Sequence, residues 1–208
     1  MNAFKLALAV AQSGPAVFGL RTGTEEPRYI LVTQLGRVEI RQYAPRLAAS
    51  ITVQGDEITA RSAGFRRLAA YIFGANTARA DIRLTAPVIQ SKAEIAMTAP
   101  VAQAQDGADR WTITFYMPAK YALATLPNPV DPEIALHAAG VATYAVYRFS
   151  GARDGMAVAK ARERLLAPLE KSAWQAAGEP VSWLYDPPWT LPWARRNEVA
   201  VPVKRRAH

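Results

Sequence analysis

The chain contains no cysteine and only two histidines. The first absence excludes disulfide bridges, thiolate metal sites and a cysteine nucleophile. Because histidine is scarce, few side chains can act as acids or bases near neutral pH. No apolar run approaches the roughly 20 residues that a helix needs to cross a bilayer, so we expect no integral membrane segment.

Charged residues are also few, at 20% of the 208 residues, whereas 50% are hydrophobic. This proportion supplies enough apolar material for a folded core and argues against disorder. The length suits one domain, or two small halves that share one core. We therefore expect a single domain over residues 25–203, preceded by a lead of residues 1–24.

The lead has some features of a secretion signal. Lys5 precedes the apolar run Leu6–Ala11, and Ala9-Val10-Ala11 has the small-x-small spacing of a cleavage site. The apolar run before that site is short for a signal peptide. We expect an uncleaved helix or flexible lead and a cytoplasmic protein, with export as the alternative.

Lysine and arginine together number 25 against 17 acidic residues, which gives a net charge of +8. The densest clusters are Arg195-Arg196 and Lys204-Arg205-Arg206, the second of them in a basic tail of residues 204–208. The other basic residues are scattered, which is typical of a solvated basic surface. We expect no nucleic-acid partner, and we expect a monomer.

A short string occurs twice. Leu84-Thr85-Ala86-Pro87-Val88 returns as Met97-Thr98-Ala99-Pro100-Val101, thirteen residues later. Proline removes a ladder donor, so each copy predicts an edge strand or the end of a strand. The residue types offer no cation and no iron ligand, which favours a structural role.

The pattern of apolar residues predicts strands and two helices. Asp56 is positioned to cap a helix that runs through Phe73 and stops at Gly74, and a second helix is expected over Met156–Ala177, kinked or broken at Pro168 and ended by Gly178. The expected strands are Arg28–Leu35, Arg37–Tyr43, Leu47–Val53, Arg110–Met117, Ile134–His137, Ala142–Phe149, Val181–Tyr185 and Asn197–Val203.

This order predicts an α+β fold of two similar halves, each a helix on an antiparallel sheet, related by approximate two-fold symmetry. In the strand Arg37–Tyr43 the residues Val38 and Ile40 alternate with polar ones. The alternation places Gln42 on the apolar face.

The chain resembles the SOUL haem-binding protein family. The matching strings are Glu39-Ile40-Arg41-x-Tyr43, Gly64-Phe65 to Tyr71-Ile72-x-Gly74-x-Asn76, the MTAPV unit, Phe149-Ser150-Gly151, Tyr185-Asp186-Pro187-Pro188-Trp189-Thr190 and Arg195-Arg196-Asn197-Glu198-Val199. They occur in the family's order and span most of the chain. The resemblance implies a distorted antiparallel β-barrel built from two pseudo-symmetric halves.

The resemblance also implies a ligand, haem or a related tetrapyrrole, in a shallow apolar cleft beside the first helix. The helix can supply an apolar floor, and arginines on or beside that face can meet the propionates. The candidate residues on the helix are Arg61, Phe65, Arg66, Leu68, Ala69 and Ile72. The alternative is that this stripe is the core face of the helix.

The loop after Val181–Tyr185 is the other candidate wall. Tyr185 occupies the position that lines the cleft in this resemblance, and Trp189 adds aromatic surface. The alternative is that the prolines stiffen a surface loop whose tryptophans pack on the barrel.

The axial position differs from that of the animal protein that gave the family its name. That protein is thought to use a histidine where this chain has Gln42, a poor iron ligand, and His137 is a weak substitute. We therefore expect reversible binding without a strong axial ligand, as in a carrier, buffer or sensor. The alternative is a non-catalytic module for another small amphipathic ligand. No Ser/His/Asp grouping, metal-ligand spacing or phosphate loop predicts an enzyme, and no catalytic residue is assigned.

Overall fold

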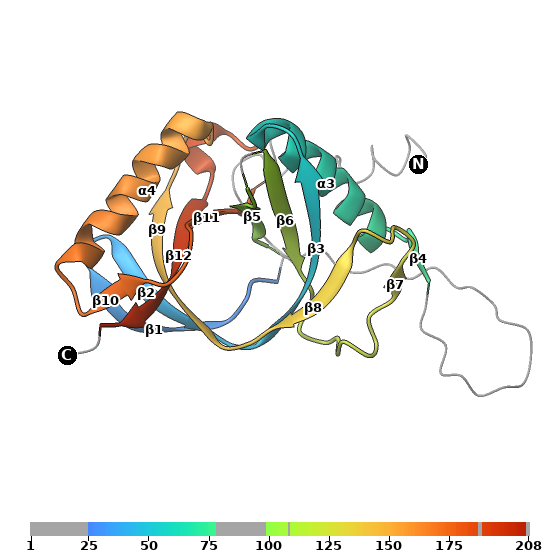
Figure 1. Cartoon of the computed structure of the whole chain (residues 1–208), viewed down its shortest axis with the longest axis horizontal. Helices are drawn as coiled ribbons and strands as arrows, with labels where there is room; N and C mark the ends of the chain where they lie inside the picture. Colours follow the sequence, from blue (N-terminus) through green and yellow to red (C-terminus); the bar gives the residue numbers. More distant parts are fainter. Residues whose placement is uncertain (1–24, 78–98, 108, 187–188, 207–208) are drawn as a thin grey trace, which may run out of the picture. The chain divides into compact units, whose positions relative to one another are not determined.

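The computed structural model describes residues 25–77, 99–107, 109–186 and 189–206 (Figure 1). The chain divides into two compact units, each described below by itself. Of the described residues, unit 1 contains 31–41 and 143–206, and unit 2 contains 25–30 and 42–142 with their gaps.

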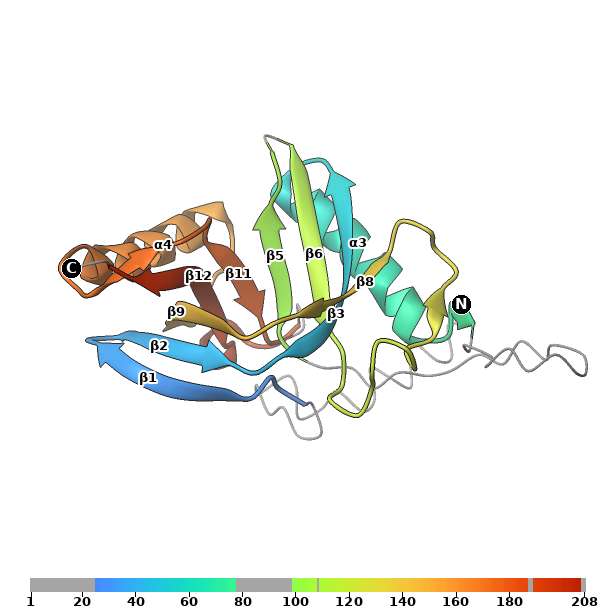
Figure 2. The same cartoon turned by 60° about the horizontal axis from the view of Figure 1, so that its bottom comes forward.

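Unit 2 is an antiparallel sheet with one helix, α3 (Glu57–Ile72), packed against it. Its main strands are β3 (Arg46–Gln54), β5 (Val101–Gln105), β6 (Arg110–Tyr116) and β8 (Ala135–Ala139). β3 lies between β6 and β8, as Figure 2 shows, and β5 pairs with the other edge of β6. A separate short ladder joins β4 (Asn76–Thr77) to β7 (Asn128–Pro129).

The boundaries of α3 follow from its caps, as predicted. The Asp56 side chain accepts hydrogen bonds from the backbone N–H groups of Ile58 and Thr59, both at 3.0 Å. A hydrogen bond from the Thr59 side chain, together with these backbone bonds, lowers the pKa of Asp56. Gly74 follows the helix with φ of 107°, a conformation that glycine adopts without strain. Inside the helix, a Cβ on Gly64 would lie only 2.8 Å from Ile113, so glycine permits this close packing on β6.

Unit 1 contains the second helix, α4 (Gly155–Glu170), and a second set of antiparallel strands. The strands are β1 (Tyr29–Leu35), β2 (Val38–Tyr43), β9 (Ala142–Phe149), β10 (Trp174–Ala176), β11 (Val181–Leu184) and β12 (Asn197–Arg205), of which β1, β2 and β9 each run a residue or two into unit 2. Their order is β1-β2-β9-β12-β11, and β10 pairs with β12. The α4 residues Val158, Ala161 and Leu165 pack with β2, β9 and β12 in one core.

The predicted length of the second helix is wrong. α4 ends at Glu170, two residues after Pro168, and Gly178 does not end it. The following residues form β10, which pairs with β12 through Trp174 and Arg205. Arg206 then donates to the carbonyls of Ser172 and Leu169, at 3.2 and 3.4 Å. The basic residues Lys204 and Arg205 are thus part of a strand.

The predicted α+β class is confirmed, because each unit combines antiparallel strands with one described helix. The first copy of the repeated string, Leu84–Val88, lies outside the described residues, as do Met97 and Thr98. In the second copy, Ala99 and Pro100 directly precede β5, which begins at Val101. Neither described helix is long and apolar enough to span a membrane.

Candidate functional site

The predicted binding residues fall in both units. Those of the first helix lie together on α3 in unit 2, whereas Tyr185 and Trp189 belong to unit 1. The helix and the loop are therefore described separately, each within its own unit.

The apolar stripe of α3 is mainly a core face. Leu68 and Ile72 are 0% and 1% exposed, packed in the core of unit 2. Ala69 is half-buried. Phe65 differs from these, because the residue is 38% exposed while its ring lies against that of Phe115, with 5.3 Å between the ring centres and 64° between the planes. Phe65 and Ala69 are the predicted apolar residues that retain surface for a ligand.

The arginines of α3 differ in their partners. Arg61 approaches Gln103 Oε1 at 3.5 Å and pairs with Glu57 at 3.7 Å. Arg66 is exposed and makes no hydrogen bond or ion pair with the part of the chain described here. Of the two predicted cations on α3, Arg66 is thus the one available to a propionate.

A third arginine of α3, Arg67, is bound to the loop that precedes β8. Its Nε and NH2 donate to the carboxylate of Asp131 at 2.6 and 2.7 Å, and Glu133 also pairs with it. These bonds hold the pKa of Asp131 below its usual range. Arg67 therefore holds the helix to this loop, and its guanidinium is engaged in these bonds.

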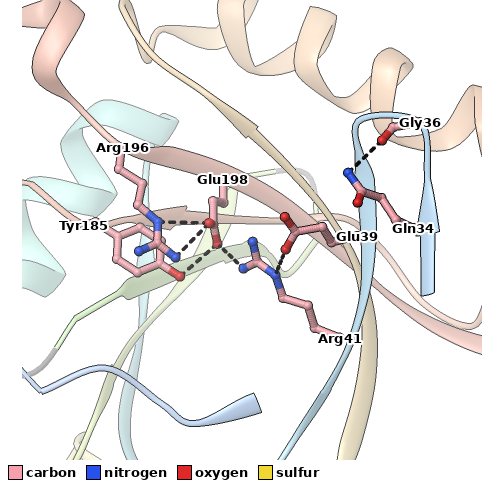
Figure 3. A network of polar contacts seen from close by, with 7 residues as sticks. All are labelled: Gln34, Gly36, Glu39, Arg41, Tyr185, Arg196 and Glu198. Carbon is pink, nitrogen blue, oxygen red and sulfur yellow. Dashed lines mark hydrogen bonds and ion pairs between the residues drawn. The ribbon is translucent and has the colours of Figure 1, made fainter. Parts of the chain in front are cut away.

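In unit 1, a buried carboxylate organises the strand that carries Tyr185 (Figure 3). Glu198 of β12 is 0% exposed. Its Oε2 accepts from Arg41 NH1 at 3.0 Å and from the Tyr185 hydroxyl at 2.8 Å. Its Oε1 accepts from Arg196 Nε at 3.0 Å and pairs with Arg196 NH2 at 2.9 Å. One side chain thus holds two guanidinium groups and a phenol.

The same network fixes the ring of Tyr185. The Arg196 guanidinium lies 3.8 Å from the centre of that ring, and the residue is only 9% exposed. Arg41 is held on its other side by Glu39, whose Oε2 accepts from Arg41 Nε at 2.7 Å. The two arginines and two glutamates balance in charge, which the burial of ions requires.

The loop that follows Tyr185 is anchored by backbone bonds. Asp186 Oδ2 accepts from the Arg196 N–H at 2.6 Å, and its carbonyl accepts from Arg153 at 3.0 Å. Trp189 is 52% exposed and Trp193, in the 3₁₀ turn η1 (Pro192–Ala194), is 73% exposed. The loop thus presents aromatic surface on a fixed base. Pro187 and Pro188 lie outside the described residues.

The two positions considered for iron ligation are both on the surface. Gln42 is exposed, although the alternation of β2 predicts it on the apolar face. It lines an open pocket of about 270 Å³ whose other walls include Tyr29, Ile30, Tyr43 and Val141. His137 is exposed on β8, opposite Ala48. No group of three or more His, Cys, Asp or Glu that could hold a metal occurs among the described residues.

Two parts of this arrangement were not predicted from the sequence. The string Arg195–Val199 could have drawn attention to Glu198, but nothing local pairs it with Arg41, 157 residues away. A second open pocket in unit 2, of about 260 Å³, contains none of the predicted binding residues. Its lining comes from four separate parts of the chain, so no motif marks it.

Each unit, taken by itself, has exposed residues that fit the edge or face of a macrocycle. In unit 2, Phe65 offers exposed aromatic area and Arg66 offers an uncommitted cation, which suits apolar contact with a tetrapyrrole and a charge pair at its edge. In unit 1, Trp189 offers exposed aromatic area. Within the described part of the predicted set, the imidazole is that of His137 on β8, and the chain has no cysteine to supply a thiolate.

Comparison with known proteins identifies the family. The sequence pattern described as SOUL heme-binding protein matches residues 24–202. No curated protein matches the chain.

Solved structures with the same fold are distant in sequence. The C-terminal domain of EcmrR superposes with a TM-score of 0.58 at 11% identity, covering 81% of this chain and 98% of that one. EcmrR in its complex with DNA gives 0.56 at 11% identity, covering 81% of this chain and 57% of that chain. A hydrolase from Listeria innocua gives 0.51 at 9% identity, covering 88% and 94%.

Proposed function

Since the chain belongs to the SOUL heme-binding protein family, we propose that it binds haem or a related tetrapyrrole reversibly, as a carrier, buffer or sensor. The observation that carries this proposal is the family match over residues 24–202. When bound, the macrocycle would supply the iron or metal chemistry. The protein would supply apolar surface, cations and exclusion of water on one face.

We propose that the contacts on α3 are made by its exposed side. Phe65 and Ala69 would lie against the macrocycle, and Arg66 would pair with a propionate, with Arg61 beside it. Leu68 and Ile72 would support this surface from the core beneath it. Within unit 1, the exposed Trp189 would supply a separate aromatic contact, and the buried Tyr185 would support the loop that carries it.

The expected affinity follows from simple magnitudes. Removing about 400 Å² of apolar surface from water gives roughly 10 kcal/mol. Association costs on the order of 4–15 kcal/mol, and an exposed Arg–propionate pair returns at most about 1 kcal/mol. Binding without an axial ligand is thus expected in the micromolar range, which suits a reversible carrier.

Titration of the purified chain with haemin should give a saturable shift of the Soret band, with half-saturation at roughly micromolar ligand. Arg66→Gln should weaken binding by a few-fold, because one charge pair is lost. The matched control is Arg110→Gln, which removes an exposed arginine at the start of β6. The absence of any saturable shift at about tens of micromolar haemin would refute the proposed function.

Replacing Gln42 with histidine should create an axial ligand. Position 42 is exposed beside an open pocket with apolar walls, so an imidazole there is accessible to iron. If the macrocycle binds beside β2, we expect the Gln42→His variant to bind haemin at least about tenfold more tightly, because a coordinate bond is added. Its absorption spectrum should change to a histidine-ligated form. A spectrum identical to that of the wild type would place every bound macrocycle away from β2.

A second candidate function is a binding module for another small amphipathic ligand, in the manner of a sensor. The fold shared with the C-terminal domain of EcmrR supports it, because EcmrR has also been described in a complex with DNA, where this fold covers 57% of its chain. A thermal-shift screen separates the two functions: stabilisation by a non-tetrapyrrole ligand, with none by haemin, would favour the sensor. We propose a non-catalytic role in either case.

A further inference from the structure

A second ligand site is indicated by the open pocket of about 260 Å³ in unit 2. Its walls are the segments 25–28, 44–47 and 116–119, and Tyr121 and Ala138 complete the lining. No residue of α3 contributes to it.

Hydrogen bonds between these segments fix the shape of the pocket. The N–H of Ala44 donates to the carbonyl of Arg28 at 3.3 Å, and that of Met117 donates to the carbonyl of Leu47 at 2.8 Å. The N–H of Ala119 donates to the Glu25 carboxylate at 2.9 Å. A pocket whose walls are already joined requires little ordering when a ligand enters.

Arg46 is the best-positioned charged group in the lining. Its guanidinium lies 4.6 Å from the centre of the Tyr43 ring and 4.1 Å from that of Tyr116. Its NH2 also donates to the Tyr116 hydroxyl at 3.1 Å. Contact with two rings orients the plane of the guanidinium before any ligand binds. A guanidinium held in this way presents a fixed positive charge to a carboxylate.

The charge around the pocket favours an anion. Arg28 and Arg46 line it, and Lys120 lies over the ring of Tyr121 at 5.2 Å. The acidic residues Glu25 and Glu26 also line it, and Glu25 already accepts a backbone hydrogen bond. Two cations and two carboxylates thus line the pocket, but Glu25 is already engaged, and the net charge of the whole chain, +8, favours an anion.

We propose that this pocket binds a flat aromatic carboxylate of one or two rings. The carboxylate pairs with Arg46, and the ring enters among the apolar side chains of Leu47, Met117 and Pro118. The volume lies below the range of about 300–1,000 Å³ that drug-sized ligands occupy, so the site takes a ligand smaller than a tetrapyrrole. The proposal is therefore independent of the proposed haem function.

Three naphthalene probes of one shape test the charge: 2-naphthoate, 2-naphthamide and 2-naphthylmethylamine. Binding to the full chain is measured by isothermal titration calorimetry near pH 7. We expect the carboxylate to bind about tenfold or more tightly than the neutral amide, and the amine to bind most weakly. Equal affinity for all three probes, or no saturable binding of 2-naphthoate at about millimolar concentration, would overturn the proposal.

Two variants locate the binding. Arg46→Gln should weaken 2-naphthoate about tenfold and weaken the amide much less, because the carboxylate alone pairs with the lost charge. Ala138→Phe fills the pocket from an exposed position on β8 and should abolish binding of both probes while the protein stays folded. The control is Arg110→Gln, an exposed arginine outside the pocket. If Ala138→Phe binds 2-naphthoate like the wild type, the ligand lies elsewhere and the assignment is wrong.

Discussion

Glu198→Ala is expected to lower the free energy of unfolding by about 3–5 kcal/mol, the usual cost of removing one partner of a buried ion pair. The carboxylate is fully buried and accepts bonds from Arg41, Arg196 and Tyr185. Its removal leaves two guanidinium groups and a phenol without their shared acceptor, in a place that water does not reach. Chemical denaturation followed by circular dichroism measures the loss.

Two further variants separate charge from shape in this network. Glu198→Gln keeps the side-chain volume and one acceptor oxygen, so it should lower the free energy of unfolding by less than Glu198→Ala does. Glu39→Ala is the matched control, because the Glu39 side chain is 33% exposed and bonds only to Arg41 in the network. We expect it to cost about 1 kcal/mol. A cost for Glu198→Ala no larger than that of Glu39→Ala would contradict the buried network.

The proposed ligand surface of unit 1 should change together with stability in Glu198→Ala. Tyr185 is held by Glu198 through its hydroxyl, and Arg196 covers its ring. Arg196 also donates its backbone N–H to Asp186, where the loop carrying Trp189 begins. Loss of Glu198 therefore loosens the strand end from which the exposed tryptophans project. The family string Arg195–Val199 therefore has a structural role, because it supplies residues that hold this loop in place.

The sequence predicted features that depend on neighbouring residues. The first helix was placed correctly because Asp56 caps it and Gly74 ends it, and both signals act within one turn. The second helix was drawn too long, because the apolar pattern continues past Pro168 into residues that instead pair with β12. Only the tertiary partner decides between a further helical turn and the short strand β10.

The position of Gln42 shows the same limit. The alternation of Val38 and Ile40 places it inside, but the structure buries Arg41 directly after Ile40 and exposes Gln42. Arg41 turns inward because Glu198 binds it there, and Glu198 is 157 residues away in the chain. The polar and apolar pattern of one strand gives no information about a partner so far away in the sequence. The open pockets of unit 2 were not predicted for a related reason, because each is formed by segments far apart in the sequence.

Leu68→Ala should destabilise the protein by about 2–5 kcal/mol and leave the affinity for haemin within about twofold of the wild type. Leu68 is 0% exposed in the core of unit 2, beside Tyr71 and Ile113, so its truncation leaves a cavity that the packed sheet cannot fill. The sequence alone could not decide whether this residue faces the core or a ligand.

Phe65→Ala is the matched variant, one turn earlier on the same helix. Because Phe65 is 38% exposed, it should lose less stability than Leu68→Ala but weaken haemin binding several-fold. Denaturation gives the stability of each variant, and the Soret titration is run where all variants are folded. If Leu68→Ala weakened haemin binding without loss of stability, Leu68 would line the ligand site. The core assignment of the α3 stripe would then be wrong. Lower stability with unchanged haemin affinity in Leu68→Ala, and weaker haemin binding in Phe65→Ala, would assign the inner side of α3 to the core and its exposed side to the ligand.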